Sequence, residues 1–242
     1  METLRSRLGS YDAGLLLDVA VGRGEFLKFA LQSFKTFVGA AGIDVSADML
    51  FIAKEALGHL PVTLVTGSAL SMPFPDHAFD TVTMSNSLHH MEDLDQLFVE
   101  MMRVCRVNGL IVINEMVSDE YSSLQENHML YHNLIAEIDK QMGHYHRNIY
   151  SKKELLGIIR EKDFKILERF MHEEKAGDLI RQEDVDQLVQ SLSRRIDMLH
   201  NTDHYYFYEN KARDIIDRLK KQGFHKPKPL TVVLRTPEKV NR

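Results

Sequence analysis

The segment that constrains the architecture of this chain most strongly is Leu15-Leu16-Leu17-Asp18-Val19-Ala20-Val21-Gly22-Arg23-Gly24-Glu25-Phe26. It opens with a short apolar run, which is typical of a buried parallel strand. The run then breaks into small residues, and an apolar-periodic segment from Phe26 to Phe34 predicts a helix. A strand, a small-residue turn and a helix form the first half of a βαβ unit. A ligand can lie against the bare backbone of such a turn, with the helix N-terminus pointing at it.

The spacing of the small residues separates this turn from the dinucleotide fingerprint G-x-G-x-x-G. Counted from Ala20, that fingerprint requires glycine where the chain has Glu25, and the glycine stands at Gly24 instead. One acid, Asp18, precedes the turn by two residues, and a second, Asp44, ends the next apolar run. Asp44 lies about twenty residues after the glycines, where an acid can accept both ribose hydroxyls of a nucleoside. The pattern therefore predicts nucleoside-type binding at this turn.

With these residues the sequence resembles the class I S-adenosylmethionine-dependent methyltransferases, in their small-molecule, type 11-like branch. The likeness rests on the D-x-G-x-G-x-G turn and on a downstream segment of the form G-D-A-x-x-L-P-F-P-D. That segment here begins Gly67-Ser68-Ala69-Leu70 and ends Pro73-Phe74-Pro75-Asp76, so Ser68 replaces the family's usual acid. Ala20 stands where the family usually has its first glycine. We expect the backbone at Ala20 to avoid the left-handed region, because alanine adopts it at a steric cost.

The resemblance implies a Rossmann-like α/β fold with seven mostly parallel strands in the order 3-2-1-4-5-7-6, strand 7 antiparallel, and helices on both faces. The element order of the sequence is similar, because alternating strands and helices in the first half favour a parallel sheet. The likeness covers Leu15 to Glu115, Ser151 to Phe170 and a last strand, Leu230 to Leu234. At 242 residues the chain is most simply one domain. Two predicted helical insertions, residues 119–150 and 177–222, interrupt it.

The resemblance further implies S-adenosyl-L-methionine as methyl donor and S-adenosyl-L-homocysteine as product. Asp44 would hold ribose, although with Ser46 close by it could instead be an acid at a helix start. Ser68 would either accept a hydrogen bond from the adenine amino group or only cap its loop. Asp18 would order the turn and reach the donor's ammonium through water. The predicted donor-binding set is Asp18, Ala20, Val21, Gly22, Gly24, Asp44, Val45, Met49, Gly67, Ser68, Ala69, Leu70, Ser85 and Asn86.

Two adjacent histidines, His89 and His90, follow the predicted fourth strand, at the sheet edge where open α/β proteins bind ligands. A neutral imidazole there could take a proton from the methyl acceptor. Equally, one histidine could orient the donor's amino-acid end while the other packs in the core. Glu115, at the end of the fifth strand, is a competing base or ammonium partner. These three residues are the catalytic candidates, although many methyl transfers need only proximity and alignment.

The helical insertions are the predicted substrate lid, because the donor residues leave no obvious acceptor pocket before Glu115 and methyl transfer requires that water be excluded. Packing of both insertions on each other, as a scaffold or a homodimer interface, is the alternative. Several histidines of the first insertion raise the question of a metal ion, but none of their spacings is diagnostic and no cysteine is near. No metal site is therefore predicted. The predicted acceptor-binding residues are His128, Tyr131, His132, His144 and Tyr206, and the four closely spaced histidines are His128, His132, His144 and His146.

Composition narrows the function classes. A formal net charge of −5 argues against nucleic acid as the main partner, because phosphate binding requires a basic surface. No apolar run approaches the length of a membrane span, and the single cysteine, Cys105, fits a reducing cytoplasm. We therefore expect a cytoplasmic enzyme that methylates a small molecule. Two rivals stay open: a non-catalytic S-adenosylmethionine-binding protein, favoured by the departures at Ala20 and Ser68, and a nicotinamide-dependent oxidoreductase, which the glycine spacing disfavours.

Overall fold

The structure is a computed structural model that describes residues 2–172 and 182–238. Its centre is one seven-stranded sheet with the order β3-β2-β1-β4-β5-β7-β6. The strands β1 to β5 run parallel to one another, and β7 runs antiparallel to both β5 and β6. The predicted fold class is confirmed. The strands are β1 (Leu15–Val19), β2 (Gly39–Asp44), β3 (Val62–Thr66), β4 (Phe79–Ser85), β5 (Cys105–Met116), β6 (Lys165–Met171) and β7 (Pro229–Arg235).

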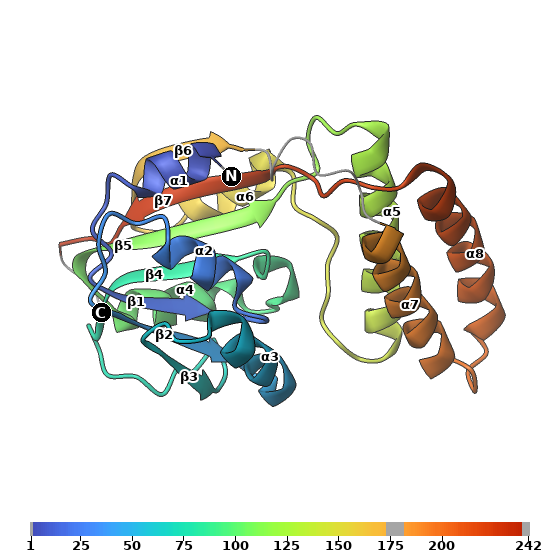
Figure 1. The fold of residues 1–242 in the computed structure, drawn as a ribbon, viewed down its shortest axis with the longest axis horizontal. Coiled ribbons are helices and arrows are strands. Elements are labelled where there is room, and N and C mark those ends of the chain that lie inside the picture. Colours follow the sequence, from blue (N-terminus) through green and yellow to red (C-terminus); the bar gives the residue numbers. More distant parts are fainter. Residues whose placement is uncertain (1, 173–181, 239–242) are drawn as a thin grey trace.

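Helices cover both faces of this sheet because its central strands are apolar on both sides (Figure 1). Successive strand residues point to opposite faces, so Leu16 packs in one cluster and Leu17 in the other. Along β5, Val112 and Ile113 divide in the same way. The helices are α1 (Glu2–Leu8), α2 (Glu25–Leu31), α3 (Ala47–Leu57), the short 3₁₀ helix η1 (Leu88–His90), α4 (Leu94–Val104), α5 (Ser123–Gln141), α6 (Lys152–Arg160), α7 (Gln182–Met198) and α8 (Tyr205–Gln222).

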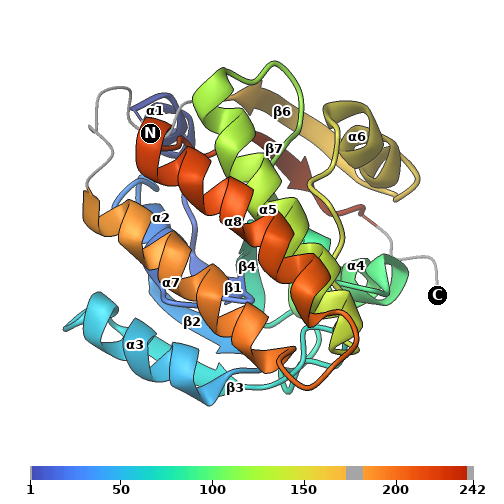
Figure 2. The ribbon, with the colours of Figure 1, turned by 90° about the vertical axis from the view of Figure 1, so that its right-hand side faces the viewer.

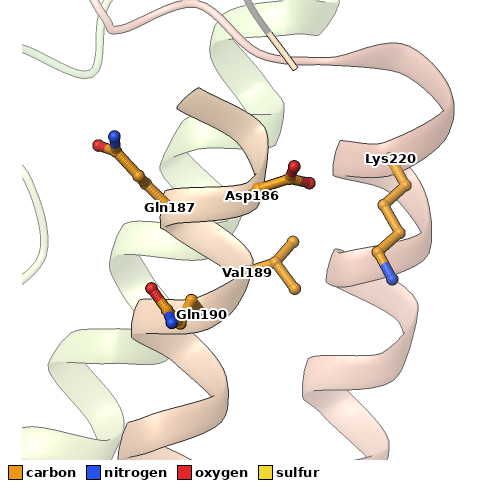
Figure 3. Close-up of a pocket in the computed structure, with 5 residues that line it drawn as sticks. All are labelled: Asp186, Gln187, Val189, Gln190 and Lys220. Atoms are coloured by element: carbon orange, nitrogen blue, oxygen red, sulfur yellow. The ribbon is translucent and has the colours of Figure 1, made fainter. Parts of the chain in front are cut away.

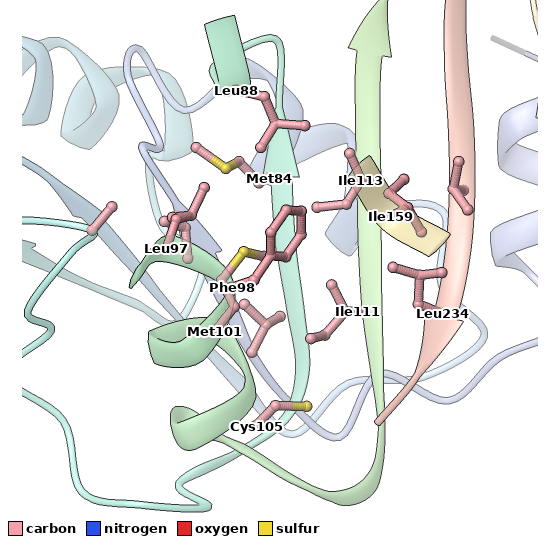
Figure 4. Packing of buried hydrophobic residues seen from close by; sticks show 14 of the residues in the cluster. Met84, Leu88, Leu97, Phe98, Met101, Cys105, Ile111, Ile113, Ile159 and Leu234 are labelled. Carbon is pink, nitrogen blue, oxygen red and sulfur yellow. The ribbon is translucent and has the colours of Figure 1, made fainter. Parts of the chain in front are cut away.

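The larger of the two clusters lies under α4 and α6. Figure 4 shows Phe98 and Met101 of α4 packed against Met84 of β4 and Ile111 of β5, all of them fully buried. The opposite face of the sheet is covered by α1, α2 and α3, whose buried leucines form the second cluster. The helices packed on both faces hold the parallel strands in place. The carboxyl ends of these strands lie along one edge, which is the edge that binds ligands in open α/β sheets.

A third apolar cluster belongs to α5, α7 and α8, which pack on each other as a three-helix group. Leu134 and Ile138 of α5 meet Leu192 of α7 and Leu219 of α8 in its interior. In Figure 1 this group stands beyond the carboxyl ends of β1, β2 and β4, and Figure 2 shows the three helices in front of that edge. We call it the helical cap. None of the described helices is both long and apolar enough to cross a membrane.

Local sequence signals explain where several elements begin. Ser122 and Gln125 form a reciprocal capping box at the start of α5, and Ser151 and Glu154 form a second one at α6, as the S-x-x-E pattern indicates. The strand β5 begins at Cys105 and shifts register against β4 between its first residue and Leu110. Residues 177–181, the start of the second predicted insertion, lie outside the described part of the chain.

Candidate functional site

The turn after β1 contains three left-handed residues at alternate positions. Ala20 has φ 54°, Gly22 has φ 52° and Gly24 has φ 78°. The prediction that Ala20 avoids the left-handed region is therefore wrong. Its neighbour Val21 is buried and donates its N–H to the carbonyl of Ile43 at 3.0 Å, and Val19 on the other side is paired within the sheet, so the chain is fixed before and after the alanine. The surrounding structure thus maintains a conformation that costs alanine roughly 1–2 kcal/mol.

The glycines of this turn serve different purposes. A Cβ added at Gly24 would meet the side chains of Ala53 and Leu57 at 3.2 Å, so this glycine allows α3 to pack closely. A Cβ added at Gly22 would meet only the carbonyl oxygen of Ala20, at 4.0 Å. Gly22 is therefore open on its outer side, and its backbone can be approached by a ligand.

Asp44 ties the turn to the end of β2. Its Oδ2 accepts a hydrogen bond from the Gly22 N–H at 2.8 Å, and its Oδ1 accepts one from the Ser46 N–H at 2.9 Å. The N-cap of α3 is Ser46, whose Oγ accepts from the Met49 N–H. Each carboxylate oxygen can accept a second hydrogen bond, so the half-buried Asp44 retains acceptor sites for a pair of hydroxyls. Its role with ribose stays a prediction.

Exposed apolar side chains stand beside Asp44. Val45 is 72% exposed and Met49 is 39% exposed, which leaves them available to cover a flat apolar ring. In the nearby loop the Oγ of Ser68 accepts a hydrogen bond from the Leu70 N–H at 3.1 Å. The loop-capping role of Ser68 is therefore present, and the second lone pair of its oxygen is still available to accept a hydrogen bond; its role with adenine stays a prediction.

Asp18 is a buried carboxyl in the middle of the sheet. Its side chain is 2% exposed, and its Oδ1 accepts a hydrogen bond from the Thr83 hydroxyl at 2.6 Å. Burial raises the pKa of Asp18 to about 7, the Thr83 hydrogen bond opposes this increase, and the charge of Asp44 adds to it. A cation near the turn would favour the ionised form, which fits the predicted contact with an ammonium group.

The raised pKa of Asp18 predicts a pH-dependent stability. The folded chain keeps this proton more tightly than the unfolded chain, so the contribution is greatest below about pH 4 and is lost as the pH rises to about 7. Asp18→Asn should remove that loss and, relative to the parent, gain roughly 2–4 kcal/mol in unfolding free energy between about pH 4 and about pH 8. Urea unfolding across this range measures the difference. Asp12→Asn, at an exposed acid before β1, is the control, and parallel pH profiles for Asp18→Asn and the parent would disprove the assignment.

Ser85 and Asn86 lie at the junction of β4 and η1. The Asn114 amide donates to the Ser85 Oγ at 2.9 Å, and the Asn86 Oδ1 accepts from the Met116 N–H at 3.0 Å. Asn86 is left-handed, with φ 48°. Both predicted donor-binding side chains therefore also join β4 to β5.

Glu115 makes hydrogen bonds to the backbone and the side chain of the segment around η1. Its Oε2 accepts hydrogen bonds from the N–H groups of Ser87 and Leu88, at 3.0 and 2.9 Å, and its Oε1 lies 2.8 Å from the Nδ1 of His89. Glu115 is 1% exposed and His89 is 3% exposed. The two catalytic candidates are thus a bonded pair, and the second ring nitrogen of His89, Nε2, is the one left for another partner.

The helical cap brings two further histidines to this pair. His132 of α5 and His146, which follows α5, face each other with 3.3 Å between their Nε2 atoms. The Nδ1 of His146 lies 2.7 Å from Asp139, whose other oxygen accepts from Arg195 of α7 at 3.1 Å. The ring of His89 lies 4.8 Å from that of His132 and 5.5 Å from that of His146. We call His89, His132 and His146 the histidine cluster.

The remaining acceptor-binding candidates are not members of the cluster, although His128 lies one turn before His132 on α5. His128 is buried with its ring 5.7 Å from that of Phe224, and Tyr131 packs in the interior of the helical cap. His144 is exposed, and Tyr206 is 75% exposed at the start of α8. His90 lies at the rim, with its ring 4.1 Å from that of His146. The sequence had singled out His146 only as one of four close histidines, because nothing in its spacing marks a residue that reaches the β4 edge.

Two surface pockets lie elsewhere and contain none of the predicted site residues. One lies between α7 and α8, where Figure 3 shows Lys220 opposite Asp186 and Val189. The other is lined by residues of α6, β6 and β7. The predicted site residues lie instead along the edge between the β1 turn and the histidine cluster.

Part of the chain is similar in sequence to known methyltransferases. Residues 17–113 match the family model described as a methyltransferase domain. A demethylmenaquinone methyltransferase of Thermobifida fusca is 40% identical over 111 residues, which are 44% of this chain and 45% of that protein. The chain thus spans about half the length of the curated relative that it matches.

Solved structures extend the likeness over the whole fold. A methyltransferase structure from Bacillus halodurans has a TM-score of 0.62 at 20% identity, covering 96% of this chain and 97% of the other. A Haemonchus contortus phosphoethanolamine N-methyltransferase in complex with S-adenosyl-L-methionine has a TM-score of 0.55 at 16% identity, covering 98% of this chain and 52% of the other. At these identities the likeness concerns the fold.

Proposed function

Residues 17–113 of this chain belong to the class I S-adenosylmethionine-dependent methyltransferases, and on that premise we propose that the protein methylates a small-molecule acceptor. The observation that supports this most strongly is the turn after β1, where the open face of Gly22 and the carboxylate of Asp44 meet through one hydrogen bond. The acceptor class is supported by relatives whose names specify small molecules. A cytoplasmic location stays a prediction.

The residues at this edge fit the donor. Gly22 offers a bare backbone for the methionine part, and the free acceptor sites of Asp44 suit the two ribose hydroxyls. Val45 and Met49 offer apolar surface to adenine, next to Ser68 and its loop. When bound, S-adenosylmethionine supplies a methyl group on a sulfonium, whose sulfur is a good leaving group. The protein must then align the acceptor with that methyl group and exclude water.

We assign the acceptor side to the histidine cluster. The cluster lies between the sheet edge and the helical cap, so α5 and the chain after it are suited to cover a bound acceptor. Glu115 occupies the Nδ1 of His89, and its Nε2 remains for the proton that an acceptor hydroxyl, thiol or amine loses.

The test is a metabolite-library screen with an isotopically labelled methyl donor, read by mass spectrometry. We expect at least one small molecule to gain a single labelled methyl group. With that acceptor, His132→Ala should lower turnover by roughly 100-fold, as expected for loss of an aligning group, while donor affinity stays within about twofold. His200→Ala, at an exposed histidine between α7 and α8, is the matched control.

A second candidate function is a non-catalytic binder of S-adenosylmethionine. The observation that favours it is Ser68, which stands where the family has an acid and whose Oγ accepts from the loop backbone. Donor binding by calorimetry, together with no labelled product across the library, would support this candidate and contradict the methyltransferase proposal.

A further inference from the structure

We propose that the histidine cluster, His89, His132 and His146, is a binding site for one divalent transition-metal ion of the Zn²⁺ class. The site joins the sheet edge to the helical cap, since His89 belongs to η1, His132 to α5 and His146 to the chain that follows α5. The existence of the site does not depend on the proposed methyl transfer.

The distances suit such an ion. One ring nitrogen from each of the three histidines lies within 4.8 Å of the other two. Imidazole nitrogens bind Zn²⁺ at about 2.0–2.1 Å, so two of them at tetrahedral angles stand about 3.3–3.4 Å apart. The Nε2 atoms of His132 and His146 are already 3.3 Å apart. The ring nitrogen of the third ligand, His89, lies within 4.8 Å of them, so it must come closer to complete the set.

Carboxylates orient two of the three rings. The Nδ1 of His89 contacts Glu115 at 2.8 Å, and the Nδ1 of His146 contacts Asp139 at 2.7 Å. Metal-bound histidines almost always donate their other ring N–H to such a group, which fixes the tautomer and makes the remaining nitrogen a better ligand. In both rings the remaining nitrogen is Nε2. The third ring, His132, has no such carboxylate: among the described residues its buried Nδ1 has no hydrogen-bond partner, and its Nε2 faces that of His146.

The environment of His132 disfavours its charged form. His132 is buried, and burial together with the neighbouring His89, His146, His128 and His90 lowers its pKa to about 2. Without an ion, the rings of His89, His132 and His146 face one another, and not all of their nitrogens have a hydrogen-bond partner within the described part of the chain.

The charge balance favours a cation. Glu115 is buried, and within residues 2–172 and 182–238 its ion-pair partner is His89, with no arginine or lysine. Asp139 already shares its charge with Arg195. A dipositive ion held by three neutral histidines would offset the buried carboxylate of Glu115, since buried charges are stable only when compensated. Three imidazole ligands suit Zn²⁺, Co²⁺ or Ni²⁺ better than Mg²⁺ or Ca²⁺, which prefer oxygen.

Three protein ligands leave a fourth position open, as in zinc sites that bind a reactant. If the proposed methyl transfer also holds, this position would take the acceptor through a hydroxyl or thiol, whose proton leaves to water on coordination. In that case the Nε2 of His89 is a metal ligand and does not accept the proton of the acceptor. Coordination to the metal ion, which lowers the pKa of the acceptor, removes that proton instead.

The test uses chelator-treated full-length protein, titrated with Co²⁺ alone and with Zn²⁺ alone. We expect one equivalent to bind, with the visible absorption of tetrahedral Co²⁺ that disappears when Zn²⁺ displaces it. His132→Ala and His146→Ala should each weaken binding by roughly 100-fold. His144→Ala, two residues from His146 and exposed, is the matched control and should bind as the parent does.

The proposal is overturned if the parent binds no Co²⁺ or Zn²⁺ more tightly than His132→Ala does, or if neither cluster variant weakens binding. Should the variants fail to fold, the Co²⁺ spectrum of the parent still decides, because octahedral or absent binding contradicts a three-histidine site. Calorimetry of the metal-free parent with S-adenosylmethionine separates this outcome from failure of the proposed function. Donor binding without metal binding would remove only the metal site and leave His89 as the proton acceptor.

Discussion

Gly22→Val should weaken S-adenosylmethionine binding by roughly 100-fold or more, a loss of about 2.7 kcal/mol. The glycine is left-handed, and a Cβ there would project to the open side of the turn, where only the Ala20 carbonyl lies within 4.0 Å. A branched side chain would therefore occupy the space that the donor requires, next to the backbone N–H that donates a hydrogen bond to Asp44. Isothermal calorimetry with purified protein measures the effect.

Gly22→Val also strains a left-handed backbone, and the effect of this strain must be separated from the steric block of the donor. Gly58 ends α3 with φ 59° and has nothing within 4 Å of an added Cβ, so Gly58→Val introduces comparable strain away from the turn. It should lower stability while donor affinity stays within about twofold of the parent. Ala20→Gly relieves a left-handed alanine in the same turn and should also preserve affinity. Normal donor binding by Gly22→Val would mean that the ligand does not lie on this turn.

Asp44→Ala should weaken donor binding by about 2 kcal/mol or more, which is roughly 30-fold. A carboxylate that accepts from two ribose hydroxyls makes charge-assisted hydrogen bonds, and alanine makes none. The variant also releases the N–H groups of Gly22 and Ser46, so the turn loses its tie to the end of β2. Calorimetry against the parent measures the loss.

The control for Asp44→Ala is Asp48→Ala, which removes an exposed acid in the first turn of α3. This change has the same effect on net charge and should leave donor affinity within about twofold of the parent. Equal affinities for Asp44→Ala and Asp48→Ala would disprove the ribose assignment, because only Asp44 contacts the turn.

The fold could be predicted because its signals are local and repeated. Apolar runs such as Leu15 to Val19 alternate with helical periods, and the capping boxes at Ser122 and Ser151 mark helix starts directly in the sequence. The proximity of Gly22 and Asp44 could also be predicted, because an acid at the end of the second strand lies next to the first turn when the two strands are parallel neighbours.

Other features depend on contacts that spacing does not reveal. The left-handed Ala20 is held by the burial of Val21 and its bond to Ile43, so the surrounding structure overrides the preference of alanine. His146 reaches the end of β4 only because the chain after α5 turns back, where the Arg147 N–H donates to the His89 carbonyl at 3.0 Å. The same return leaves His144 exposed.

The most direct test of the donor site is a calorimetric titration of the parent protein with S-adenosylmethionine and, separately, with NADH. The turn of Ala20, Gly22 and Gly24 with Asp44 predicts one S-adenosylmethionine bound per chain at micromolar affinity or better and no heat of binding with NADH. Binding of NADH with none of S-adenosylmethionine would contradict the account and indicate a nicotinamide-dependent protein instead.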